Sequence, residues 1–120
     1  MQTVLVVEDD TMVRMPIAEY LRDCGYTVLE AGSASEAIAT LDSGAPVGLV
    51  FSDIRMPGKM DGLGLAEWCH VHCPAVPVLL TSGYSGGQNP KTTPFPGTGF
   101  VEKPYSQLHV GRLIAELFDR

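Results

Sequence analysis

The chain has 120 residues, of which 45% are hydrophobic and 18% charged, a balance typical of one globular domain with a single core. Its formal net charge of -6 argues against direct binding of nucleic acid, which needs a basic face. No apolar run approaches the roughly 20 residues that cross a bilayer, and no basic leader precedes the first strand pattern, so we expect a cytoplasmic protein without membrane contact.

Short apolar runs alternate with segments of helical periodicity along the whole chain. The runs predict strands at 4–7, 26–30, 47–53, 76–81 and 100–101. Apolar residues at helical spacing predict helices at 13–24, 34–41, 63–73 and 110–117. Glycines and prolines punctuate the polar stretch between 83 and 99, so a fourth helix there is expected to be short or irregular.

Strands that alternate with helices predict an α/β fold, a five-stranded parallel sheet with helices on both faces, built as a single domain over 1–120. The carboxyl ends of all strands in such a sheet lie at the same edge. Acidic, hydroxyl and basic residues follow the predicted strands, and we expect them to converge there: Glu8, Asp9, Asp53, Thr81 and Lys103.

Three carboxylates at one edge repel one another unless a cation lies among them. Hard carboxylate oxygens suit Mg²⁺, which also accepts oxygens from a phosphorylated substrate. With the ion in place, Asp53 can act as a nucleophile on a phosphoryl group, while Lys103 and Thr81 stabilise the transferring oxygens. The predicted product is an aspartyl phosphate.

Five motifs in chain order resemble the receiver domain of two-component response regulators, and the resemblance spans the whole chain. They are Val-Glu-Asp-Asp at 7–10, Ser-Asp-Ile-Arg-Met-Pro-Gly at 52–58, Met-Asp-Gly at 60–62, Thr-Ser-Gly-Tyr at 81–84 and Glu-Lys-Pro-Tyr at 102–105. The resemblance implies a flavodoxin-like sheet with strand order 2-1-3-4-5. The last two motifs also resemble receivers at the C-terminus of hybrid sensor histidine kinases.

The same resemblance implies a role for each site residue. Glu8, Asp9, Asp53 and the backbone carbonyl of Arg55 would hold Mg²⁺, for which Mn²⁺ would substitute. Asp53 would accept phosphate from a histidine kinase or a histidine phosphotransfer protein, and Thr81 and Lys103 would contact the phosphoryl group. Thr81 and Phe100 would form the switch that a downstream protein partner reads, and the Lys103-Pro104 bond would be cis. A homodimer is left open.

Two other functions stay open at this stage. A pseudo-receiver would bind partners without phosphorylation, although the acceptor residues are all present. An aspartate-nucleophile phosphatase would need an acid two residues after Asp53, where Arg55 stands, so we expect a switch and not a turnover enzyme. Cys69-His70-Val71-His72-Cys73 looks like a zinc cluster, but helical spacing places the histidines away from the face that the cysteines share. An odd number of cysteines, three, favours free thiols.

Overall fold

The computed structural model describes residues 2–83 and 98–119. The fourth helix that the sequence predicts as short or irregular falls within 84–97, outside the described residues. The lysine that precedes Pro104 is joined to it by a cis peptide bond, as the resemblance implied.

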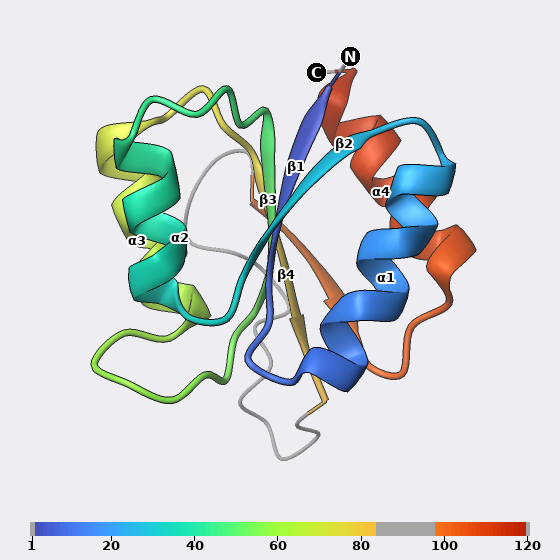
Figure 1. Cartoon of the computed structure of the whole chain (residues 1–120), viewed down its shortest axis with the longest axis horizontal. Helices are drawn as coiled ribbons and strands as arrows, with labels where there is room; N and C mark the ends of the chain where they lie inside the picture. The colour runs from blue at the N-terminus through green and yellow to red at the C-terminus, as the bar shows by residue number, and fades with distance from the viewer. Residues whose placement is uncertain (1, 84–97, 120) are drawn as a thin grey trace.

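The described residues form one sheet of five parallel strands between two layers of helices (Figure 1). The sheet has the predicted order β2-β1-β3-β4-β5, which confirms the flavodoxin-like fold. The strands are β1 (Thr3–Val7), β2 (Thr27–Ala31), β3 (Leu49–Asp53), β4 (Val78–Ser82) and β5 (Thr98–Glu102). One face is covered by α2 (Ala34–Asp42) and α3 (Gly62–His72), the other by α1 (Thr11–Asp23) and α4 (Gln107–Phe118).

Polar caps explain where the helices begin. The side chain of Asp10 accepts a hydrogen bond from the Met12 amide at 2.9 Å and caps α1. Ser106 caps α4 in the same way, which starts this helix at Gln107, three residues before its predicted start. β5 is also longer than the predicted 100–101 because Thr98 to Glu102 pair with β4 along its whole length, a contact that a local pattern does not contain.

The sheet has apolar side chains on both faces, since successive residues of a strand point to opposite sides. On β1, Val4 and Val6 belong to the core beneath α1 and α4, whereas Leu5 and Val7 belong to the core beneath α2 and α3. The same alternation runs through the other central strands. Every strand therefore has a defined face toward each helical layer.

α3 begins directly against the end of β3, and only a glycine permits this contact. The Gly62 amide donates to the Ile54 carbonyl at 2.7 Å. A Cβ at Gly62 would lie 2.7 Å from the Ile54 Cα and 2.9 Å from the carbonyl carbon of Asp53, distances shorter than any real Cβ contact. The backbone at the end of β3 is thus fixed by the helix that follows it.

We expect Gly62→Ala to lower the free energy of unfolding by about 3 kcal/mol, the upper end of the range for overpacking, because the clash is with backbone. Urea unfolding monitored by circular dichroism measures this. The matched control is Gly64→Ala in the same helical turn, whose Cβ would meet side chains and no backbone: the flexible Met60 at 2.8 Å and Asp61 Oδ1 at 3.7 Å. An equal loss in the two variants would contradict the explanation.

Candidate functional site

Strand alternation brings the predicted site residues to one side of the carboxyl edge of the sheet. Four of the five residues expected to converge, all except Asp9, lie two residues after a side chain of the core beneath α1 and α4, and so on the same face. The pairs are Val6 and Glu8, Phe51 and Asp53, Leu79 and Thr81, and Val101 and Lys103. Sheet hydrogen bonding continues past the strand ends, with the Glu8 amide bonded to Ala31 and the Lys103 amide to Ser82, both at 3.0 Å.

The side chain of Lys103 connects two buried carboxylates. Its Nζ lies 3.0 Å from Glu8 Oε1 and 3.3 Å from Asp53 Oδ2, although Glu8 follows β1 and Asp53 ends β3. Each of Glu8, Asp9 and Asp53 offers a carboxylate oxygen, and these oxygens lie within 4.8 Å of one another. The predicted convergence of these side chains is therefore present in the structure.

The electrostatics of the cluster show competition between burial and pairing. Burial raises the pKa of Glu8 above its usual 4.5, although the Asp10 amide and the Lys103 ammonium both favour the charged form. Burial alone would lower the pKa of Lys103, but the hydrogen bond to Glu8 and the charge of Asp53 outweigh it and raise this pKa. Lys103 is consequently held as a cation beside acids that gain from further positive charge.

Thr81 lies next to Asp53 in the register between β3 and β4. Its hydroxyl is buried and finds no hydrogen-bond partner in the part of the chain that the structure describes. Buried hydroxyls are normally bonded, so an unpartnered one beside Asp53 can serve a ligand oxygen. A cavity of about 310 Å³ opens here, lined by Asp53, Arg55, Ser82, Gly83 and Lys103.

The donor set fits a hard divalent cation. Among residues 2–83 and 98–119, Glu8, Asp9 and Asp53 form the one group of three acidic, His or Cys side chains close enough to share an ion. Carboxylate oxygens are the ligands that Mg²⁺ takes, and an exposed Asp9 beside buried Glu8 and Asp53 leaves room for water ligands.

Arg55 and Phe100 are the remaining predicted site residues. Arg55 is exposed and lines the same cavity as Asp53, and the role of its carbonyl stays a prediction. Phe100 is half-buried on β5 and packs into the core beneath α2 and α3, on the face of the sheet opposite to Thr81. Its switching role also stays a prediction.

The Cys-His segment at the end of α3 makes local contacts. Cys69 is buried, which raises the pKa of its thiol to about 12, and Cys73 lies one helical turn further on. The His72 ring stacks on Trp68 with ring centroids 4.3 Å apart. All three cysteines are free thiols, as predicted.

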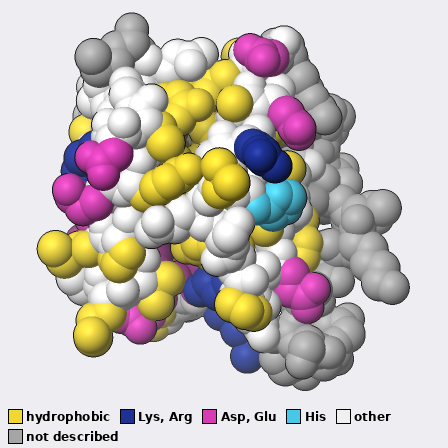
Figure 2. All heavy atoms as spheres, turned by 90° about the vertical axis from the view of Figure 1, so that its right-hand side faces the viewer, with side chains coloured by type: hydrophobic (Ala, Val, Ile, Leu, Met, Phe, Trp, Pro, Cys, Tyr) yellow, Lys and Arg dark blue, Asp and Glu magenta, His cyan; other side chains and the backbone are white. Residues whose placement is uncertain are grey.

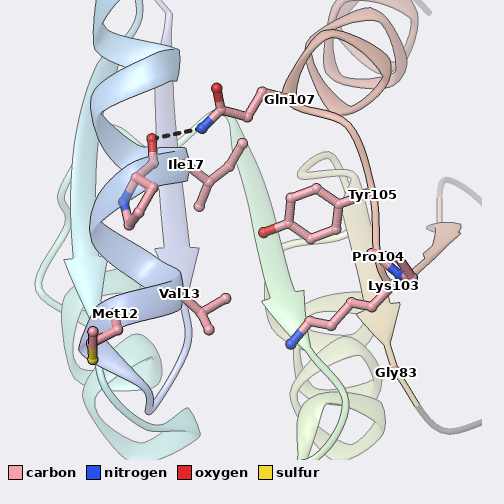
Figure 3. A pocket seen from close by; sticks show the side chains of 9 residues that line it. Met12, Val13, Ile17, Gly83, Lys103, Pro104, Tyr105 and Gln107 are labelled. Carbon is pink, nitrogen blue, oxygen red and sulfur yellow. Dashed lines mark hydrogen bonds between the residues drawn. The ribbon is translucent and has the colours of Figure 1, made fainter.

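A second cavity, of about 460 Å³, lies beside the Asp53 cavity and was not predicted from the sequence (Figure 3). Met12, Val13, Pro16 and Ile17 line it from α1, and the chain leading from β5 into α4 lines the other side, where Gln107 donates to the Pro16 carbonyl at 3.3 Å. Figure 2 views this face of the molecule and shows hydrophobic side chains gathered across it. The sequence signal for this cavity was Met12, a large apolar residue that lies off the apolar stripe of α1. In the structure Met12 is 85% exposed.

Comparison with protein families finds the response regulator receiver domain over residues 4–114. The sensor kinase CckA of Brucella abortus (strain 2308) is 34% identical over 98% of this chain, which spans only 13% of that kinase. In the described part of the chain, no helix is both long and apolar enough to span a bilayer.

Two solved structures share the fold along nearly the whole chain. The receiver domain of the hybrid histidine kinase CckA matches with a TM-score of 0.82 and 30% identity, covering 97% of this chain and 98% of that one. The response regulator TrrA from Thermotoga maritima, solved in complex with Mg²⁺-BeF, matches with a TM-score of 0.85 and 26% identity, covering 98% and 99%.

Replacing Lys103 by Met removes the cation between two carboxylates. We expect the metal-free variant to lose about 1–3 kcal/mol of unfolding free energy at about pH 7.5, because buried charges are left unpaired. The loss should shrink toward about pH 5, since the raised pKa of Glu8 lets it take up a proton and removes the repulsion. Urea unfolding in the presence of a chelator at the two pH values measures both effects.

The control is Lys59→Met, which removes an exposed lysine from the loop before α3 and should leave stability unchanged at either pH. A loss in Lys103→Met that is the same at both pH values would show that packing of the lysine stem, and not its charge, matters.

Proposed function

Because this chain belongs to the response regulator receiver domain family, we propose that it is the phosphoacceptor switch of a two-component phosphorelay, with Asp53 as the acceptor. The observation that carries the proposal is the group of three carboxylates within 4.8 Å of one another, with Lys103 bonded to two of them. An acceptor needs a nucleophilic oxygen, a site for a cation and a positive group for the transferred oxygens, and these groups supply all three.

In the proposed reaction a carboxylate oxygen of Asp53 attacks the phosphorus of a phosphohistidine. The bond between phosphorus and the donor nitrogen breaks, its electron pair stays on the imidazole, and a bond from phosphorus to Asp53 forms. The Lys103 ammonium, already 3.3 Å from Asp53, stabilises charge on the transferring oxygens, and the Thr81 hydroxyl donates to one of them. Water later hydrolyses the aspartyl phosphate slowly and restores the acid.

Glu8, Asp9, Asp53 and the Arg55 carbonyl would hold Mg²⁺ or Mn²⁺ in this scheme. The ion supplies neutralisation of charge on the phosphoryl oxygens. The buried Glu8 is anchored by Lys103 on one oxygen and by the Asp10 amide, at 3.1 Å, on the other, which fixes its direction before any ligand arrives.

The switch would start at Thr81, whose hydroxyl gains a partner when Asp53 carries a phosphoryl group. Thr81 pairs with Val101 in the register between β4 and β5, and Phe100 is the next residue on β5. A shift of Thr81 toward the phosphoryl group is therefore passed to the strand that bears Phe100. The phosphorylated form then favours one of two arrangements of this region and one downstream protein partner.

The phosphodonor, a histidine kinase or a histidine phosphotransfer protein, would contact the groove between α1 and the chain leading from β5 into α4. This groove shares Gly83 and Lys103 with the acceptor cavity, so a protein seated there has its phosphohistidine next to Asp53. Exposed Met12 and Met15 add apolar surface, which association requires. The domain would be either a separate regulator or one unit of a larger chain such as a hybrid kinase.

We expect the chain to gain the mass of one phosphoryl group on incubation with acetyl phosphate and Mg²⁺, because a small donor can reach Asp53 through the open cavity. Asp53→Asn should gain none, and Asp42→Asn, an exposed acid on α2, should react as the original chain does. Intact-protein mass spectrometry measures this. A chain that never gains the group would be a pseudo-receiver, and sustained release of phosphate from phosphomonoesters would indicate a phosphatase.

Asp9→Ala should weaken Mg²⁺ binding by about 10-fold or more and slow labelling of Asp53, since it removes a carboxylate from the cation site. Isothermal titration calorimetry measures the affinity, and the mass gain with time measures the rate. Asp10→Asn is the control, because it removes the adjacent charge but keeps a good helix cap. Equal affinities in Asp9→Ala and the control would place the ion elsewhere.

A further inference from the structure

We propose that Arg14 is a positioning residue for the cation site, because its guanidinium holds the peptide that joins Glu8 to Asp9. The inference rests on the proposed function and extends it beyond the residues that meet the phosphoryl group. It concerns how Glu8 and Asp9, in the connection between β1 and α1, are held in position relative to Asp53.

The contact is direct. Arg14 Nη1 donates to the Glu8 carbonyl oxygen at 2.8 Å. That carbonyl belongs to the rigid peptide plane between Glu8 and Asp9, so its direction sets the orientation of both Cα atoms. Lys103 and the Asp10 amide already hold the Glu8 side chain, and Arg14 completes the set by holding its backbone.

The guanidinium is itself fixed from the other side. Arg14 Nε lies 3.0 Å from Glu30 Oε1 on β2, and Arg22 Nη2 lies 3.1 Å from Glu30 Oε2. Burial favours the neutral form of Glu30, but the two guanidinium groups outweigh it and lower its pKa, so the carboxylate stays charged. Only 18% of the Arg14 side chain is exposed. The planar fork of arginine can bond a carbonyl and a carboxylate at once, which a lysine ammonium does with less directional control.

Two roles for Arg14 predict opposite results. As a nearby positive charge alone, it repels a divalent cation, and its removal would tighten Mg²⁺ binding. As a positioning group, its removal frees the peptide between two ligands and weakens binding. The sign of the change in affinity therefore decides between them.

The experiment compares Arg14→Met, Arg14→Lys and Arg22→Met by calorimetric titration with Mg²⁺. Arg22→Met is the matched control, since Arg22 shares the Glu30 partner but has no bond to Glu8. We expect Arg14→Met to weaken Mg²⁺ binding by about 10-fold, the low end of the range for groups that orient metal ligands, and the control to change it less than about 2-fold. Arg14→Lys should weaken binding to a smaller extent, because it keeps the charge but not the fork.

Unchanged or tighter binding in Arg14→Met would overturn the inference, and so would equal weakening in Arg22→Met. Far-ultraviolet circular dichroism of each variant verifies the fold, and Arg14→Lys decides the matter if the Met variant does not fold: binding equal to that of the original chain would overturn the inference. Failure of the proposed function is distinct, because the original chain itself would then neither bind Mg²⁺ nor take up a phosphoryl group from acetyl phosphate.

Discussion

The two hydrogen bonds of the Lys103 ammonium, to Glu8 and to Asp53, are the interaction on which the site depends. In the chain, Lys103 lies 95 positions from Glu8 and 50 positions from Asp53. The three residues meet at the edge of an apolar sheet, where burying an unpaired carboxylate costs free energy. The lysine directly follows β5 and extends toward the end of β3, as Figure 3 shows. One side chain thereby ties an outer strand to the centre of the sheet and lets acids remain at a buried position.

The rest of the site follows from the geometry of parallel strands. Side chains two positions apart on a strand point to the same face of the sheet. Glu8, Asp53 and Thr81 each lie two positions after a core residue, so they share one face at the edge where all strands end. The loops then fix details that strands cannot. Gly62 lets α3 pack against the backbone at the end of β3, and the Arg14 guanidinium holds the backbone of the acidic turn after β1.

The charges of the cluster are out of balance. One ammonium faces three carboxylates, burial raises the pKa of Glu8, and the Thr81 hydroxyl has no partner in the described part of the chain. Each of these groups gains from a divalent cation or from a phosphoryl oxygen. A site with such unmet interactions can respond to ligands with a change of structure, which is the behaviour that a signalling receiver needs.

Local features of the sequence predicted the fold class, the strands that end in acids or hydroxyls, and the convergence of Glu8, Asp9, Asp53, Thr81 and Lys103 at one edge, because apolar runs and their flanking residues can be recognised along the chain. The folded arrangement revealed which oxygens Lys103 bonds, that the Thr81 hydroxyl has no partner among the described residues, and that Arg14 reaches the Glu8 carbonyl. It also revealed the groove beside Asp53 and the full length of β5. These properties depend on packing between segments that are distant in the chain, and local periodicity does not predict the distances between such segments.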